Sequence, residues 1–309
     1  MSQRPGFVGV DDYLNLPRDR QTWILKPLIP ISGAALLYGA EKTGKSYLAI
    51  QLALAMSGQG DNWLGFPIVR SGRVLYLQLD TPRSLWATRF DDMIKKGGLK
   101  YNTDTLLLAD RESIDYHPFD ILDSSHMKYL YSLVRKHDPI AVIIDTLRMV
   151  HSGDENDSTV SRNVLGNLVG ATHPAALIVV SHSRKPNQDG TKDVMADHRG
   201  SSNITASMDA IMRLTKNKLY YAGRSIEEGD VKLARLDNGL WMPQLDESGP
   251  AINKVVADAS LPTLRAKARV LATMLGKTED AAMSMLRRVV ASERPEKSEK
   301  PAEKPTEIA

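Results

Sequence analysis

The residues GAEKTGKS, at positions 39–46, constrain the fold more than any other part of the sequence. They fit the pattern G-x-x-x-x-G-K-[ST], they follow the short apolar run AALLY, and they open a long apolar segment. A glycine-rich loop between a buried strand and a helix turns successive backbone N–H groups toward a phosphate chain. We therefore predict a nucleotide-binding loop made of Gly39, Ala40, Glu41, Lys42, Thr43, Gly44, Lys45, Ser46 and Tyr47.

Three residues in and beyond this loop have predicted chemical roles. Lys45 is placed to reach the β- and γ-phosphates, and the hydroxyl of Ser46 is placed to bind Mg²⁺. Asp145 ends the apolar run AVIID, where a P-loop protein keeps the acid that holds the metal through water. The alternative for Asp145 is an aspartate that caps the next turn. The expected ligands are ATP and Mg²⁺.

The remaining pattern predicts an α/β fold around a mostly parallel sheet flanked by helices. Apolar runs of strand length alternate with helical patterns, which is typical of parallel strands covered on both faces. After about residue 206, strand-like runs follow one another with only short turns, which predicts an antiparallel extension of the sheet. The predicted strands are 34–38, 72–79, 105–109, 139–145 and 175–181, and the predicted helices are 46–56, 84–96, 122–136 and 158–171.

Composition limits the class of protein. The chain has 309 residues, a net charge of +3 and no cysteine, which excludes disulfides, zinc ribbons and thiol catalysis. It has no signal peptide and no apolar run of membrane-spanning length, so we expect a cytoplasmic protein, of a bacterial cell or of a host cell if the gene is viral or plasmid-borne. The predicted organisation is an N-terminal segment (1–30), an ATPase domain (31–245), a small helical C-terminal appendage (250–292) and a disordered tail (293–309).

Several motifs occur together in a fixed order. They are ALLYGAEKTGKSYLAIQLALA, SGRVLYLQLDTPRSL, AVIIDTLRMV, HSGDENDS, LIVVSHSRK and RGSSNITASMDAIMRL. This ordered set, over about residues 23–242, resembles the RecA-like P-loop ATPases of the RepA hexameric replicative helicase group. The resemblance implies ATP hydrolysis by a homo-oligomeric ring, expected to be a hexamer, with nucleotide at the subunit interfaces and single-stranded DNA as partner.

The resemblance also implies roles for four further residues. His182 follows the strand AALIVVS at the place of the γ-phosphate sensor. Asp80 stands where the family usually carries a glutamate that orients the attacking water, and it is one methylene shorter; a shift of one residue would place that position on Leu79. Arg199 and Arg224 are candidates to reach the nucleotide of a neighbouring subunit, and each has the alternative of an ordinary surface residue.

A long polar segment between His182 and Arg199 is the predicted DNA-contacting loop. In RecA-like rings the loop at this place lines the central channel, and basic side chains there bind the phosphate backbone. The segment lacks an aromatic residue, so binding should tolerate any sequence and weaken with salt. The alternative is a plain surface loop. The candidate DNA-binding residues are Arg184, Lys185 and Lys192.

The sequence leaves three other functions open. The shorter acid Asp80 suits an ATP-gated DNA-binding or annealing protein that hydrolyses slowly. A P-loop small-molecule kinase is a third interpretation, although the late antiparallel strands argue against it. A regulatory switch would use the Pro/Glu/Lys-rich tail as a tether for a protein partner.

Overall fold

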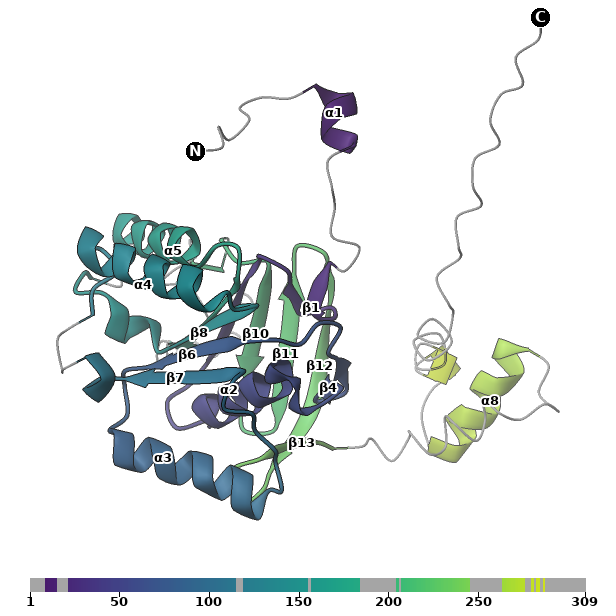
Figure 1. Ribbon diagram of the computed structural model, residues 1–309. Coiled ribbons are helices and arrows are strands. Elements are labelled where there is room, and N and C mark those ends of the chain that lie inside the picture. The colour runs from purple at the N-terminus through teal and green to yellow at the C-terminus, as the bar shows by residue number, and fades with distance from the viewer. Residues whose placement is uncertain are drawn as a thin grey trace, which may run out of the picture. The chain divides into compact units, whose positions relative to one another are not determined.

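The computed structural model describes most of the chain. The described residues are 9–15, 22–114, 119–154, 157–183, 204–205, 207–244, 263–275, 279–280, 282–283 and 286. The chain divides into two compact units, Met1–Gln244 and Leu245–Ala309. The first unit contains the sheet and the candidate site (Figure 1).

A nine-stranded sheet forms the centre of the first unit. From β10 to β7 the six neighbouring strands are parallel, and β11, β12 and β13 continue the sheet in antiparallel pairs. The predicted fold class is therefore confirmed, including the antiparallel extension. The strands are, in spatial order, β13 (Trp241–Pro243), β12 (Ile226–Arg235), β11 (Lys218–Gly223), β10 (Ala210–Leu214), β3 (Ala34–Gly39), β9 (Ala176–His182), β8 (Ala141–Asp145), β6 (Val74–Gln78) and β7 (Leu106–Asp110).

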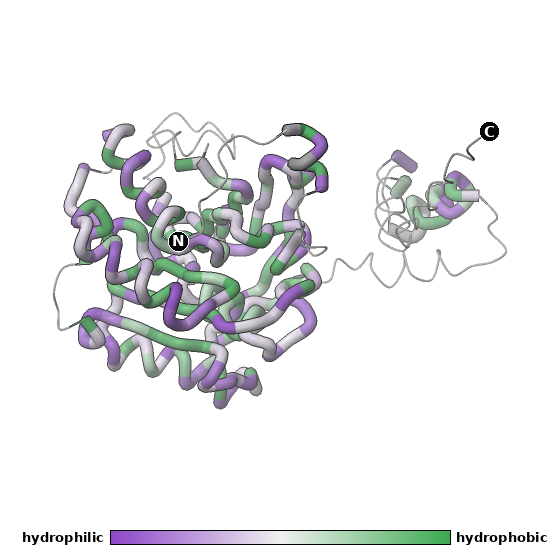
Figure 2. The backbone as a smooth tube through the Cα atoms, turned by 45° about the horizontal axis from the view of Figure 1, so that its top comes forward, coloured by the Kyte–Doolittle hydropathy of each residue, from purple (hydrophilic) through white to green (hydrophobic). Residues whose placement is uncertain are grey.

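Helices cover both faces of this sheet (Figure 1). The helices α2 (Lys45–Leu54) and α3 (Arg83–Asp91) bury their apolar residues on one face, and α4 (Ser124–His137) and α5 (Ser158–Thr172) on the other. A π-helical turn extends α2 through Ala55–Gln59, and another extends α3 through Asp92–Lys96. Figure 2 shows hydrophobic and hydrophilic stretches alternating along the chain of this unit.

The smaller elements lie around this core. They are α1 (Val10–Leu14), the two-stranded sheets β1 (Trp23–Leu25) with β2 (Ile29–Pro30) and β4 (Asn62–Trp63) with β5 (Phe66–Pro67), and the 3₁₀ turns Glu112–Ile114 and Leu147–Val150. In the second unit, α8 (Leu264–Leu275) is the longest described helix, and the Nε of Arg269 lies 2.9 Å from Oε1 of Glu279. None of the helices in the described part of the chain combines the length and apolarity that crossing a bilayer requires.

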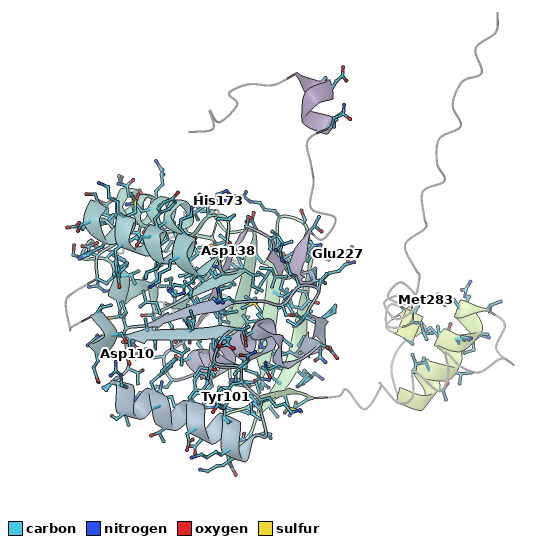
Figure 3. The ribbon with its side chains drawn as sticks, viewed as in Figure 1. Tyr101, Asp110, Asp138, His173, Glu227 and Met283 are labelled. Atoms are coloured by element: carbon cyan, nitrogen blue, oxygen red, sulfur yellow. The ribbon has the colours of Figure 1, made fainter. Side chains whose placement is uncertain are left out.

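The parallel strands give the sheet two distinct edges. Asp138 and His173 follow α4 and α5 and lie near the edge where β8 and β9 begin, whereas Asp110 ends β7 at the opposite edge (Figure 3). The loop that follows β3 also lies at this second edge, because β3 is parallel to β9 and β9 to β8. In parallel α/β sheets the edge formed by the carboxyl ends of the strands is where ligands bind.

Candidate nucleotide-binding site

The loop that joins β3 to α2 has a backbone that requires glycine at two positions. Gly39 ends β3, and a Cβ atom there would lie 2.2 Å from the carbonyl oxygen of Leu214 in β10. Gly44 precedes α2 with φ of 91°, in the left-handed region that glycine adopts without strain. The two glycines therefore permit the close approach and the turn from which α2 starts.

Lys45 is buried within this loop and its ammonium is held by backbone oxygens. Its Nζ donates to the carbonyl oxygens of Gly39, at 3.0 Å, and Ala40, at 2.8 Å, and lies 3.2 Å from Nδ1 of His182. Burial lowers the pKa of Lys45 from 10.5 to about 8, against the opposing effect of Asp145 and other nearby carboxylates. An added phosphate would supply the negative charge that this buried ammonium lacks.

Asp145, at the end of β8, is a buried carboxylate with one oxygen engaged. Its Oδ2 accepts a hydrogen bond of 2.8 Å from the hydroxyl of Tyr76 on β6. Its Oδ1 is buried and has no hydrogen-bond partner among the described residues. Burial raises the pKa of Asp145, while Tyr76 and the nearby Ser46 hydroxyl act to lower it.

These groups fit a magnesium ion. The unpartnered Oδ1 of Asp145 offers an acceptor for a water of the metal, and Ser46 offers a hydroxyl beside it. The described residues contain no cluster of three or more carboxylate or imidazole side chains that could hold a cation by itself. A magnesium ion here would therefore depend on phosphate oxygens and water for its remaining ligands, as Mg²⁺ commonly does in nucleotide sites.

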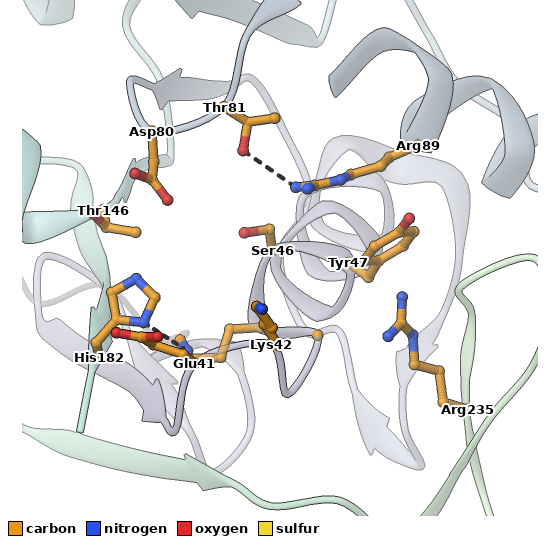
Figure 4. Close-up of a pocket in the computed structure, with 12 residues that line it drawn as sticks. Glu41, Lys42, Ser46, Tyr47, Asp80, Thr81, Arg89, Thr146, His182 and Arg235 are labelled. Carbon is orange, nitrogen blue, oxygen red and sulfur yellow. Dashed lines mark hydrogen bonds between the residues drawn. The ribbon is translucent and has the colours of Figure 1, made fainter. Parts of the chain in front are cut away.

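One cavity of about 540 Å³ brings the predicted residues together. Figure 4 shows Asp80, Thr146 and His182 around one end of it, with Ser46 between that end and the other. Asp80 is exposed in the cavity, whereas Leu79 is buried, so the acid after β6 needs no shift of one residue to reach the site. Burial, together with the charge of Lys45, lowers the pKa of His182, so this imidazole is neutral near pH 7.

The other end of the cavity is built from an aromatic ring and two guanidinium groups. Tyr47, the first residue after the loop motif, has the Cζ of Arg235 4.2 Å from its ring centroid and the Cζ of Arg89 5.6 Å away. The Nη1 of Arg89 also donates to Oγ1 of Thr81, at 3.2 Å (Figure 4). Cations stacked on an aromatic ring form a positive, flat-walled surface.

Comparison with protein families decides the relationship of this chain. The model of the AAA_25 family, described as an AAA domain, matches residues 2–188, which is more than half of the chain. The chain belongs to the AAA_25 family. A search of curated protein sequences finds no significant match.

Solved structures show the same fold for this AAA_25 chain. One of them, the ATPase domain of another protein, aligns with a TM-score of 0.50 at 16% identity, over 69% of this chain and 85% of that one. A second, a DnaB-like replicative helicase solved to describe its interactions with primase, aligns with a TM-score of 0.52 at 15% identity, over 75% of this chain and 66% of that one. The resemblance to RecA-like P-loop ATPases of the helicase group is confirmed at the level of family and fold.

The structure places most of the predicted site residues of the AAA_25 domain around the cavity. Gly39, Ala40 and Thr43 shape the loop instead, and Oγ1 of Thr43 donates to the carbonyl oxygen of Ala40 at 2.8 Å. The predicted residues that line the cavity are Glu41, Lys42, Gly44, Lys45, Ser46, Tyr47, Asp80 and His182, and Asp145 lies buried beside Lys45.

Arg224 is the predicted residue that lies elsewhere. It follows β11 at the opposite edge of the sheet, where its Nη1 is 3.7 Å from Oδ1 of Asp209. Arg224 therefore does not contribute to the cavity of its own subunit. Arg184, Lys185, Lys192 and Arg199 lie outside the described residues, as does the segment 293–309.

Four cavity residues were not predicted from the sequence. They are Thr81, Arg89, Thr146 and Arg235. Two of them carry a signal that topology makes readable: Arg89 lies nine residues after Asp80 on the helix that follows β6, and Arg235 ends a strand that returns to the edge at which β11 began. Thr81 and Thr146 simply follow residues already assigned to the site.

The lowered pKa of Lys45 predicts a pH dependence of stability in the nucleotide-free protein. Between pH 8 and 10.5 the unfolded chain holds the lysine proton and the folded chain has lost it, so stability rises with pH over this range. Compared with Lys45→Met, the wild type should gain at most about 1.4 kcal/mol of unfolding free energy per pH unit.

Urea denaturation of both proteins from pH 7 to pH 10 measures this difference directly. Lys42→Met, which removes an exposed lysine of the same loop, is the matched control and should show no such trend relative to wild type. A difference between wild type and Lys45→Met that stays constant with pH would contradict the buried, charge-deprived ammonium.

Proposed function

We propose that this AAA_25 chain is an ATP hydrolase that assembles into a homo-oligomeric ring, expected to be a hexamer, and moves on single-stranded DNA. The observation that carries the proposal is the convergence of Lys45, Asp80, Asp145 and His182 on one cavity at the carboxyl edge of a RecA-like sheet. That set contains a phosphate-binding cation, an acid for the metal, an acid for the water and a neutral polar side chain.

Each of these residues has a part in the proposed reaction. Lys45 would bind the phosphates, and Asp80 would orient the attacking water toward the γ-phosphate. Mg²⁺, held by Ser46 and through water by Asp145, would neutralise charge on the phosphates. His182 lies beside Lys45 at the start of the segment that leads to Arg184 and Lys185, so loss of the γ-phosphate could be transmitted along that segment.

The position of Arg224 supports a role in a neighbouring subunit. It cannot join the cavity of its own chain because the length of the sheet separates the two. A guanidinium supplied by a neighbour stabilises the charge that develops on the phosphates, and it makes hydrolysis depend on assembly. Arg199 remains a second candidate for the same role. In this arrangement each nucleotide would sit at a subunit interface.

A second function rests on the identity of Asp80. Its carboxylate is shorter than the glutamate that the resemblance implies at this place, and a water held less well is activated less well. We therefore retain an ATP-gated protein that binds or anneals single-stranded DNA and hydrolyses slowly. Directional unwinding of a duplex distinguishes the two functions, because only the motor performs it.

ATP hydrolysis with and without single-stranded DNA tests the proposed motor. We expect DNA to stimulate turnover, the stimulation to fall as salt rises, and Lys45→Ala to abolish turnover in both conditions. The salt dependence is expected because basic side chains release counterions from the phosphate backbone. Turnover that stays near zero while ATP still binds would contradict the motor and favour the ATP-gated alternative.

A mixing experiment tests the role of Arg224 in a neighbouring subunit. Arg224→Ala and Lys45→Ala should each be inactive alone. In mixed rings an intact site forms wherever an Arg224→Ala subunit binds the nucleotide beside a Lys45→Ala subunit that supplies its arginine, which is about a quarter of the sites at equal amounts. Steady-state hydrolysis should therefore reappear on mixing. An Arg224→Ala protein with full activity, or a mixture that stays inactive, would exclude the neighbour's arginine.

A further inference from the structure

Tyr76 is a buried hydroxyl that the mechanism above does not use. It lies on β6 two residues before the strand ends, its side chain is 1% exposed, and its hydroxyl donates to Oδ2 of Asp145 at 2.8 Å. Asp145 is equally buried. The two residues come from neighbouring parallel strands, so the sheet itself brings the hydroxyl to the carboxylate.

Packing alone does not require a hydroxyl at this position. The ring of Tyr76 packs against Trp86 of α3 with centroids 5.4 Å apart, and Trp86 packs against Phe90 at the same separation. A phenylalanine would make these ring contacts as well. A buried hydroxyl without a partner is costly, so tyrosine is favoured here only because Asp145 accepts its proton in a hydrogen bond.

The hydrogen bond restricts the carboxylate of Asp145 in a specific way. A carboxylate can rotate about its last bond, and engagement of Oδ2 by Tyr76 holds that rotation. The same bond leaves Oδ1 without a partner among the described residues, and thus available to a metal-bound water. Groups that hydrogen-bond a metal-binding carboxylate orient it in this manner.

We propose that Tyr76 is a positioning residue that orients Asp145 for the magnesium ion of the nucleotide. This proposal rests on the proposed function, since it presupposes that Asp145 serves a metal bound with nucleotide. Tyr76 does not line the nucleotide cavity; it acts through Asp145. Its hydroxyl should therefore affect metal affinity and leave metal-free nucleotide binding unchanged.

Tyr76→Phe in the full chain tests the proposal, because it removes the hydroxyl and keeps the ring. Two affinities are measured: that of ADP in EDTA, and that of Mg²⁺ for the protein–ADP complex, followed by calorimetry. We expect the first to be unchanged and the second to weaken about tenfold, the usual scale for loss of a group that orients a metal ligand. Neither readout requires turnover.

Trp86→Phe is the matched control for packing. It disturbs the same ring contact and removes no hydrogen bond among the described residues, because the indole Nε1 has no partner there. It should lower stability and leave the Mg²⁺ affinity of the ADP complex unchanged. If Tyr76→Phe does not fold, as judged by circular dichroism, Tyr76→Met also lacks the hydroxyl and fills the space flexibly.

The possible results are distinguishable. Unchanged Mg²⁺ affinity in Tyr76→Phe, with wild type binding both ADP and Mg²⁺, would overturn the role of Tyr76 alone. An equal loss of Mg²⁺ affinity in Trp86→Phe would also overturn it, since packing would then be the cause. A wild-type protein that binds no ADP would overturn the proposed function, and the role of Tyr76 with it.

Discussion

The hydrogen-bonded register of the parallel strands is the constraint on which the site depends. Gly39 lies opposite His182 where β3 pairs with β9, and Gln78 lies opposite Asp145 where β6 pairs with β8. Side chains alternate between the two faces of a strand, so a slip of one residue would turn Asp145 to the other face. The register therefore brings the phosphate loop, the metal-binding acid and the imidazole to one edge, although these residues lie far apart in the sequence.

Electrostatics at that edge leaves the nucleotide-free site under-compensated. The ammonium of Lys45 is buried and rests on two carbonyl oxygens, which lowers its pKa, and the buried carboxylate of Asp145 has a raised pKa. Each group carries a desolvation cost that a nearby opposite charge would offset. A phosphate chain with a magnesium ion supplies both charges at once, which explains why these residues are buried beside a cavity of about 540 Å³.

The sequence alone predicts the architecture and much of the cavity, and a physical reason separates what it predicts from what it misses. Strand-to-loop transitions mark Lys45, Asp80, Asp145 and His182, because each follows or ends a continuous apolar run. Arg235 escapes such reasoning, since it meets Tyr47 only after β11 and β12 have reversed direction twice. The contact of Tyr76 with Asp145 is likewise a matter of register between two strands, and a local pattern contains no register.

Calorimetric titration of ADP with Mg²⁺ into the full chain tests the account most directly. Wild type should bind one nucleotide per chain, and Lys45→Met should bind it far more weakly while remaining folded, because the phosphates then lose the buried cation of the loop. Absence of binding to wild type, or equal binding to both proteins, would contradict the assignment of this edge of the sheet as the nucleotide site.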